Sequence, residues 1–511
     1  MVAGLALVCI AAVSTPALAL SPEAKVSAEK VRSDLKYLRK LLSRTHPNLY
    51  AHKGPKKLRR EFNAIEAKVK GEMRMGEAMV RVQQLLAAIC DEHTSINLRD
   101  TFEHIDWINT KIVEQPIIST PNKVVLDEWG IKTAPVQLLG LDRLKAREMD
   151  QNLRSIISSD GCSGERPIFS RLAGFPTTML LNYFHPRSEQ YVSITRKRVP
   201  IDAEENSDVE FKVIYPFSLG AIYQRARLDL PTRRIIPLNS AGIPYERRHY
   251  YKINDRNYSG ILGIVSPDKK YAYVHMGTFE MGKKQETAIN EVMRKIIKEN
   301  PEHVILDLTE SPGGYSRSAS RLLSYFLPRS HQIAKSVYRI NRKFPTGNNF
   351  TPHSAQRAKM EKKFIRQFRR VPRKRSRYTL LLRRTSFGNP HFRGKVTVLV
   401  GPQTHSAATI AALVLKREIE ATIIGYQSGG DTRTSCFAAD GTYRLPATGI
   451  KVLIPETCFE RVRSRKGRGG PLKPDIEVDP FAQPSGELLQ AILQAGADHV
   501  AGRDKTAAKS N

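Results

Sequence analysis

The sequence predicts an α/β protein, and the prediction rests on a pattern repeated in its second half. Short apolar runs, as expected for strands buried in a parallel sheet, occur at 272–276, 304–308, 395–400 and 421–425. Segments with the periodicity of amphipathic helices lie between them, at 286–298, 316–326 and 406–417. Strands that alternate with helices in this way form parallel βαβ units, which bind ligands beyond the carboxyl ends of their strands.

The rest of the chain divides into further predicted regions. Of its 511 residues, 41% are hydrophobic and 26% charged, which excludes a disordered chain, a collagen-like fibre and a coiled-coil rod. Leu35, Leu38 and Leu42 recur at helical spacing, so we expect an N-terminal helical domain at 20–99. The remaining expected regions are a mixed α+β region at 100–250, the βαβ core at 251–480, and a C-terminal helix and disordered tail at 481–511.

The N-terminal segment and the cysteines indicate the cellular compartment of the protein. Residues 1–19 are almost entirely apolar and end in a small-x-small cleavage pattern, so we expect a signal peptide and an exported protein, periplasmic or secreted. An uncleaved membrane anchor is the alternative. Discounting Cys9, four cysteines permit two disulfides: Cys90, Cys162, Cys436 and Cys458. Cys436 and Cys458 bracket a short β-rich stretch and are the favoured pair. No histidine or cysteine pattern has metal-site spacing, so no metal or other cofactor is expected.

The charge of the chain is strongly positive. Lys and Arg number 82 against 50 Asp and Glu, a formal net charge of +32. Much of this excess lies in a predicted insertion at about 329–394, within a cationic run from Lys362 to Arg377. Two interpretations are open, a solvated surface loop and a docking patch for anionic lipid or lipopolysaccharide. Nucleic acid is not expected, because no recognisable binding module accompanies the charge.

Two predicted loops carry residues suited to acyl transfer. Ser406 follows a buried strand and a tight turn and opens a helix, where the helix dipole and the first N–H groups stabilise a developing oxyanion. Gly313 and Gly314 follow the preceding strand, and without a Cβ their backbone can approach a substrate carbonyl closely. Each feature also has a purely structural interpretation, the serine as a helix N-cap and the glycines as a plain turn.

Five segments, in sequence order, resemble the C-terminal processing, or tail-specific, serine peptidases. Asp91-Glu92-His93-Thr94 is similar to the DGHT element of the branch akin to the tricorn core and the retinoid-binding relatives. The other four are 306–314, similar to the LDLRxNxGG segment, 398–408, similar to the nucleophile segment, 424–425, similar to the next strand and its glycine, and 472–476, similar to the PDI element. The resemblance implies a ClpP/crotonase-like βαβ core.

The resemblance also implies an activity and the groups that carry it. The chain is expected to be a serine-type endopeptidase that hydrolyses peptide or protein substrates through an acyl-enzyme on Ser406. The oxyanion hole would comprise the N–H of Ala407 and that of Gly313 or Gly314. A catalytically inactive relative that binds peptide or a hydrophobic ligand in the same cleft is the alternative, and a surface-docking protein that uses the basic insertion is a third.

The general base is less directly indicated. Many family members use a lysine after the strand that ends in Gly425, but residues 428–431 read Ser-Gly-Gly-Asp here, and the usual arginine and asparagine of the LDLRxN segment are absent as well. His405 adjoins Ser406, and neighbours on a helix do not face each other. His93 is the expected base, because the resemblance to the tricorn-like branch implies a histidine at this position; the structural alternative is a buried histidine bonded to Asp91. The acid that orients it is left open among Glu460, which is favoured, Asp431 and Glu92.

Overall fold

The computed structural model describes residues 24–97, most of 261–477 and separate segments between them. The gaps in the second range are 267, 280–281, 310, 342, 371–377, 383–386, 433–434, 438–440 and 461–469. The separate segments are 117–119, 124–126, 136–141, 144–145, 151–152, 154–159, 168–170, 191–198, 210–216 and 247–250. The expected signal peptide, Cys162, the C-terminal region at 481–511 and part of the cationic run lie outside the described residues. Within them, no helix has both the length and the apolar character needed to cross a bilayer.

The N-terminal region is helical, as its periodicity predicts. Its helices are α1 (Ala28–Thr45), α2 (Pro55–Ala67) and α3 (Met75–Ala87), and an antiparallel pair of strands, β1 (Lys25–Ser27) and β2 (Glu72–Arg74), joins their ends. Leu35, Leu38 and Leu42 on α1 are fully buried, because their spacing places them on one face.

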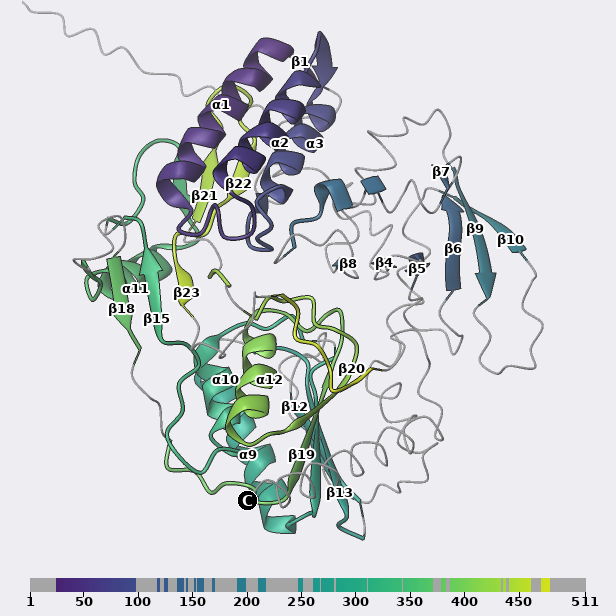
Figure 1. Cartoon of the computed structure of the whole chain (residues 1–511), viewed down its shortest axis with the longest axis vertical. Coiled ribbons are helices and arrows are strands. Elements are labelled where there is room, and N and C mark those ends of the chain that lie inside the picture. Colours follow the sequence, from purple (N-terminus) through teal and green to yellow (C-terminus); the bar gives the residue numbers. More distant parts are fainter. Residues whose placement is uncertain are drawn as a thin grey trace, which may run out of the picture.

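The core of this helical region also takes in a hairpin from the other end of the chain. The hairpin consists of β21 (Gly441–Arg444) and β22 (Lys451–Leu453), which stand beside α1 in Figure 1. Its strands belong to a small sheet with β16 (Phe350–Pro352) and β3 (Ser95–Ile96). Leu445, Ile450 and Val452 pack into the same apolar cluster as the leucines of α1. The two regions that the sequence analysis separates thus share one core.

A separate sheet occupies the middle of the chain. Its strands run in the spatial order β10-β9-β6-β5-β4-β8, with β7 paired to β6, and every pairing is antiparallel. The bounds are β4 Ile117–Ser119, β5 Val124–Leu126, β6 Val136–Leu141, β7 Leu144–Lys145, β8 Ile168–Ser170, β9 Tyr191–Arg198 and β10 Glu210–Pro216.

The βαβ core forms the far end of the molecule, opposite α1–α3 (Figure 1). Its sheet has the order β11-β12-β13-β14-β19-β20-β24, and every pairing from β13 onward is parallel. The strands are β11 Arg247–Tyr250, β12 Ile261–Val265, β13 Tyr271–Met276, β14 His303–Asp307, β19 Lys395–Val400, β20 Thr422–Gly425 and β24 Ile476–Glu477. The helices are α9 Lys283–Glu299, α10 Ser316–Leu323 and α12 Ser406–Glu418. The predicted α/β class is confirmed.

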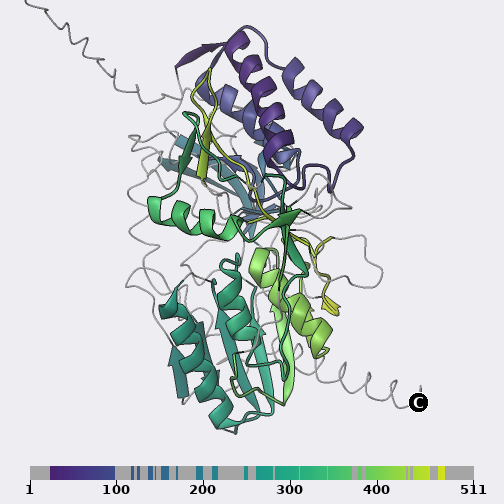
Figure 2. The same cartoon turned by 90° about the vertical axis from the view of Figure 1, so that its left-hand side faces the viewer.

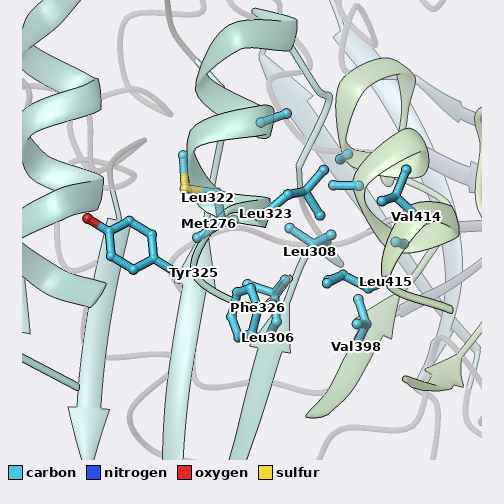
Figure 3. Packing of buried hydrophobic residues seen from close by; sticks show 14 of the residues in the cluster. Met276, Leu306, Leu308, Leu322, Leu323, Tyr325, Phe326, Val398, Val414 and Leu415 are labelled. Atoms are coloured by element: carbon cyan, nitrogen blue, oxygen red, sulfur yellow. The ribbon is translucent and has the colours of Figure 1, made fainter. Parts of the chain in front are cut away.

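Apolar side chains from strands and helices fix α10 and α12 on this sheet. Figure 3 shows Leu306 and Val398 on adjacent parallel strands, close to Leu323 of α10 and Leu415 of α12. All four side chains are completely buried. Burial of a leucine-sized side chain contributes about 1.5–3 kcal/mol, so this cluster holds the C-terminal turns of α10 and α12 against the sheet.

The described part of the predicted insertion lies between the two ends of the molecule and forms a third unit. It contributes helix α11 (Ala355–Ile365) and strands β15 (Ser336–Arg339), β17 (Arg369–Arg370) and β18 (Tyr378–Leu381). These strands form a sheet of order β17-β18-β15-β23, in which β23 (Cys458–Glu460) comes from the C-terminal part. Figure 2 shows α11 between the helical region and the βαβ core.

Candidate active site

The nucleophile candidate sits on a sharp turn between β19 and α12. Ser406 is the first residue of α12, and its φ of +46° lies in the left-handed region that a residue with a side chain rarely adopts. Thr404 holds this turn, since its hydroxyl donates to the Leu308 carbonyl at 2.8 Å and accepts from the Gly401 N–H at 2.9 Å. The N-cap position belongs to His405, so the interpretation of Ser406 as an N-cap is wrong. Strained backbone of this kind costs about 1–3 kcal/mol and clusters at functional sites.

The glycine loop after β14 lies directly against this serine. The two strands are parallel neighbours, so their carboxyl ends open onto the same edge of the sheet. Gly313 has a φ of +89°, and a Cβ placed on it would lie 2.7 Å from both the Ser406 Cβ and the Ala407 nitrogen. The predicted oxyanion groups Gly313 and Ala407 are therefore brought together beside Ser406.

Gly314 continues the loop and is fixed by Phe279. The Phe279 N–H donates to the Gly313 carbonyl at 2.7 Å, and the Tyr315 N–H donates to the Phe279 carbonyl at 2.5 Å. A Cβ on Gly314 would lie 1.9 Å from that carbonyl oxygen, so only glycine fits. The loop is thus held at both ends.

An acidic side chain from the N-terminal region contacts the neighbour of the nucleophile. The Glu92 carboxylate is hydrogen-bonded to His405 Nδ1. The other face of the His405 ring packs against a glycine turn, where a Cβ on Gly429 would lie 2.1 Å from Nε2. Gly429 therefore leaves room for the His405 ring, which contacts both this turn and Glu92.

The predicted base is part of the same turn as Glu92. His93 Nε2 is 3.7 Å from Glu92 Oε1, and His93 Nδ1 is 3.4 Å from Asp91 Oδ1. Asp91 also accepts the His93 backbone N–H at 2.9 Å. The His93 side chain is 18% exposed, which leaves it accessible to a substrate. Among the described residues, no hydrogen bond joins His93 to the Ser406 hydroxyl; the connection between them runs through Glu92 and His405.

Both carboxylates of this turn are held in the charged form. Burial would raise the pKa of Asp91, but hydrogen bonds with His46 and His93 and the charges of those rings lower it well below its usual range. Burial likewise opposes the charge of Glu92, whereas the charge and hydrogen bond of His405 and the charge of His93 lower the pKa overall. A negative group beside an imidazole stabilises the imidazolium that forms when it accepts a proton.

The remaining predicted residues are two cysteines and two acids. Cys436 and Cys458 form a disulfide, and Cys436 lies near Asp91. Glu460 ends β23 opposite Ser336, and its side chain is outside the described part of the chain. Asp431 is buried, and its backbone pairs with Pro471. Of the three acids considered, Glu92 lies beside the predicted base, with its Oε1 3.7 Å from His93 Nε2.

Two contributors were missed by the sequence analysis. Asp91 was considered only as the partner of a structural histidine, and His405 was set aside because it cannot face Ser406. For Asp91, the available signal was its place in the sequence beside Glu92 and His93. No local signal could pair His405 with Glu92, because their contact depends on how distant segments fold together.

The departures from the family pattern also have a structural account. At the arginine position, Thr309 donates from its N–H and its hydroxyl to Asp307, at 2.8 and 2.6 Å. At the asparagine position, the Ser311 carbonyl accepts the His405 N–H at 3.0 Å. Both residues therefore shape the two loops, and Ser311 connects them directly.

A strained serine at a helix N-terminus, a glycine loop against its side chain and an acid–imidazole turn nearby are the components of serine-dependent acyl transfer. Residues 270–478 match the family model for peptidase family S41. Over these residues the chain is similar to peptidase family S41, which supports a serine peptidase, and the resemblance to the tail-specific peptidases is confirmed.

Solved structures show a similar fold. A serine-to-alanine mutant of CPAF superposes with a TM-score of 0.55 at 13% identity, covering 92% of this chain and 98% of that one. Mature CPAF bound to lactacystin gives 0.52 at 14% identity, covering 91% and 97%. The photosystem II D1 C-terminal processing protease is also matched, with a TM-score of 0.40 at 12% identity, covering 88% and 93%, and this score is too low to bear on the fold. At these identities the likeness concerns the fold alone. No curated protein matches the chain.

Proposed function

We propose that the protein is an exported serine endopeptidase, periplasmic or secreted, in which Ser406 attacks the peptide carbonyl and His93 accepts its proton. His93 returns that proton to the leaving amine as the acyl-enzyme forms on Ser406. It then takes a proton from the water that attacks the acyl group and passes it to the Ser406 oxygen. Asp91 and Glu92 stabilise the charged form of the His93 ring. The N–H groups of Ala407 and of Gly313 or Gly314 bind the oxyanion.

One observation favours a catalytic role over a role in binding alone. The turn that contains His93 reaches the nucleophile turn through the contact of Glu92 with His405, the residue before Ser406. This contact supports the proposal, because it joins the turn that carries His93 to the residue before Ser406, and the mechanism needs an imidazole beside the serine. Catalytic hydrogen bonds are often long without substrate and tighten in the complex, so the missing direct bond does not exclude the dyad.

The test is covalent labelling of the folded protein by a fluorophosphonate probe. We expect the wild-type chain to be labelled and Ser406→Ala to be silent. Ser316→Ala is the matched control, because Ser316 also opens a helix at this edge of the sheet, on the loop that carries Gly314. Labelling that persists in Ser406→Ala, or a folded wild type that never labels and cleaves no peptide, would contradict the proposal and favour the inactive binding protein.

The same probe separates the two histidines. His93→Gln should slow labelling and peptide hydrolysis by about 100-fold or more, the contribution expected of a general base. His405→Gln keeps a polar side chain beside Glu92 and should retain measurable hydrolysis. An equal loss of labelling and hydrolysis in both variants would contradict the assignment of His93 as the general base. Fractionation of cells that express the full chain tests the export.

A second proposal concerns the basic insertion, whose described part presents an exposed cationic surface. Exposed basic side chains occur along α11 and on β17: Lys359, Lys362, Lys363, Arg366, Arg369 and Arg370. Met360 among them is 52% exposed. Clustered lysine and arginine beside an exposed apolar side chain suit the surface of an anionic membrane. We propose anionic lipid as the ligand of this surface.

Vesicle binding tests the surface independently of catalysis. The full chain should bind vesicles that contain phosphatidylglycerol more tightly than purely zwitterionic vesicles, and added salt should weaken this binding. Lys362→Ala/Lys363→Ala should weaken it, whereas Lys56→Ala/Lys57→Ala, an exposed pair on α2, should not. Equal weakening of vesicle binding in both double variants would show that binding depends only on the overall charge of the chain. Binding to lipopolysaccharide alone would replace lipid as the ligand.

A further inference from the structure

A buried group of metal-binding side chains lies behind the predicted base. His46, Asp91 and Cys436 each place one donor atom within 4.8 Å of the donors of the other two. All three residues are almost fully buried, and His46 Nε2 is bonded to Asp91 Oδ2 at 2.6 Å. They come from the end of α1, the turn after α3 and the strand-like segment opposite β23. In the oxidised protein the Cys436 sulfur is bonded to Cys458 and cannot serve as a thiolate ligand.

The backbone keeps the two sulfurs together independently of the disulfide. Cys436 and Cys458 form an antiparallel bridge with their Cα atoms 3.9 Å apart. The Phe437 N–H donates to the Thr457 carbonyl at 2.8 Å, and the Phe459 N–H donates to the Ser435 carbonyl at 2.9 Å. These bonds flank the cysteines on both sides, so reduction would leave two adjacent thiols, with that of Cys436 beside His46 and Asp91.

We propose that reduction of this disulfide creates a Zn²⁺ site made of Cys436, Cys458, His46 and Asp91. A thiol reductant supplies two electrons and two protons, the S–S bond breaks, and the reductant is oxidised to its own disulfide. Zn²⁺ then displaces the two thiol protons, and the His46 ring binds in its neutral form. Two sulfurs, one nitrogen and one carboxylate oxygen form a donor set that favours tetrahedral zinc. Zinc binding would move the two sulfurs apart and would separate His46 Nε2 from Asp91 Oδ2, which are 2.6 Å apart, while the Cys436 sulfur approaches both.

Zinc at this position would inhibit the peptidase, an extension that rests on the proposed function. Asp91 accepts the His93 N–H through Oδ1 and faces the His93 ring, while Oδ2 bonds His46. A carboxylate bound to Zn²⁺ loses most of its negative charge toward other partners, so His93 would lose the group that orients it and stabilises its charged form. The oxidised protein would be active, and the reduced, zinc-bound protein inactive.

Metal binding is measured on the full chain in its oxidised form and after reduction and removal of the reductant. Reduced protein should bind one Zn²⁺ at this site, and Co²⁺ in its place should give the thiolate charge-transfer band and intense tetrahedral ligand-field bands. Oxidised protein should give neither. Cys458→Ser and His46→Gln should weaken the site by at least about tenfold. Cys90→Ser is the control: Cys90 is disulfide-bonded in the native chain, but its sulfur is not part of the cluster.

The outcomes separate the metal site from the peptidase proposal. Equal Co²⁺ spectra in wild type and Cys458→Ser, or a reduced protein that binds no metal while its circular dichroism stays native, would overturn the site. With the site present, Zn²⁺ should slow fluorophosphonate labelling of reduced protein by about 100-fold, and a chelator should restore it. Labelling unchanged by bound zinc would overturn the inhibition. If oxidised protein is never labelled, the proposed function fails and the zinc measurements still stand.

Discussion

Glu92 and His405 form a hydrogen-bonded pair although 313 positions separate them in the sequence. Glu92 belongs to the turn that carries the predicted base, and His405 precedes the predicted nucleophile. Both side chains are mostly buried, 14% and 17% exposed, so water competes weakly for their contact. The pair therefore fixes the distance between the helical region and the βαβ core at the point where the two halves of the candidate site meet.

The first prediction tests that pair by its charge. Glu92→Gln preserves the size of the side chain but removes the carboxylate, and it should lower the unfolding free energy at neutral pH by about 1–3 kcal/mol. The folded protein lowers the Glu92 pKa below its ordinary 4.5, so the stabilisation is present above that value and is lost as the pH falls below it. The variant should therefore lose less stability in acid than wild type, as measured by urea unfolding between pH 3 and 7. Parallel profiles would contradict this.

The second prediction concerns the contact of the glycine loop with the nucleophile. In Gly313→Ala the new methyl group meets backbone atoms of His405 and Ala407 that cannot move separately from the turn. Fluorophosphonate labelling should fall by at least about tenfold, because the oxyanion donors shift away from the serine. Gly347→Ala is the control: its φ of +116° is also left-handed, but no atom lies within 4 Å of the added Cβ. Both variants bear the backbone strain, so an equal loss of labelling would show that strain alone is responsible.

The regular part of the core could be predicted from local sequence because its strands are buried on both faces. Strands such as β14 and β19 consist mostly of apolar residues, and the predicted strand 395–400 agrees with the observed bounds. The predicted helix at 406–417 ends one residue early. Parallel pairing then places Gly313 and Ser406 at the same edge, which is why these two residues were predicted together.

Features that depend on contacts between distant segments were not predictable in the same way. The hairpin of β21 and β22 has short strands of mixed polarity, and nothing in its pattern indicates that it completes the core of α1–α3. Likewise, the spacing of Asp91, Glu92 and His93 shows that they share a turn but not which of them reaches His405. These arrangements result from tertiary packing, which single-sequence periodicity does not encode.

The third prediction tests the attachment of that hairpin. Asp34 on α1 is completely buried and accepts from the Ala447 N–H at 2.9 Å and from the N–H and hydroxyl of Thr448 at 2.7 and 2.6 Å. Asp34→Ala leaves these donors without an acceptor and should lower the unfolding free energy by about 2–4 kcal/mol. Asp34→Asn retains one oxygen and should cost less. Denaturant unfolding measures both, and an unchanged midpoint in Asp34→Ala would show that the hairpin is held by its apolar contacts alone.

The fourth prediction uses a buried histidine far from the candidate site. Burial and the nearby charge of Lys395 lower the pKa of His303 to about 4, from an ordinary 6.5. Between these values the unfolded chain binds the proton and the folded chain does not, so folding loses stability as the pH falls, by about 3 kcal/mol from pH 7 to pH 4. His303→Gln keeps a partner for Thr397 but does not titrate, so its unfolding free energy should decline less by that amount. Equal declines in the two proteins would show that His303 titrates normally in the fold.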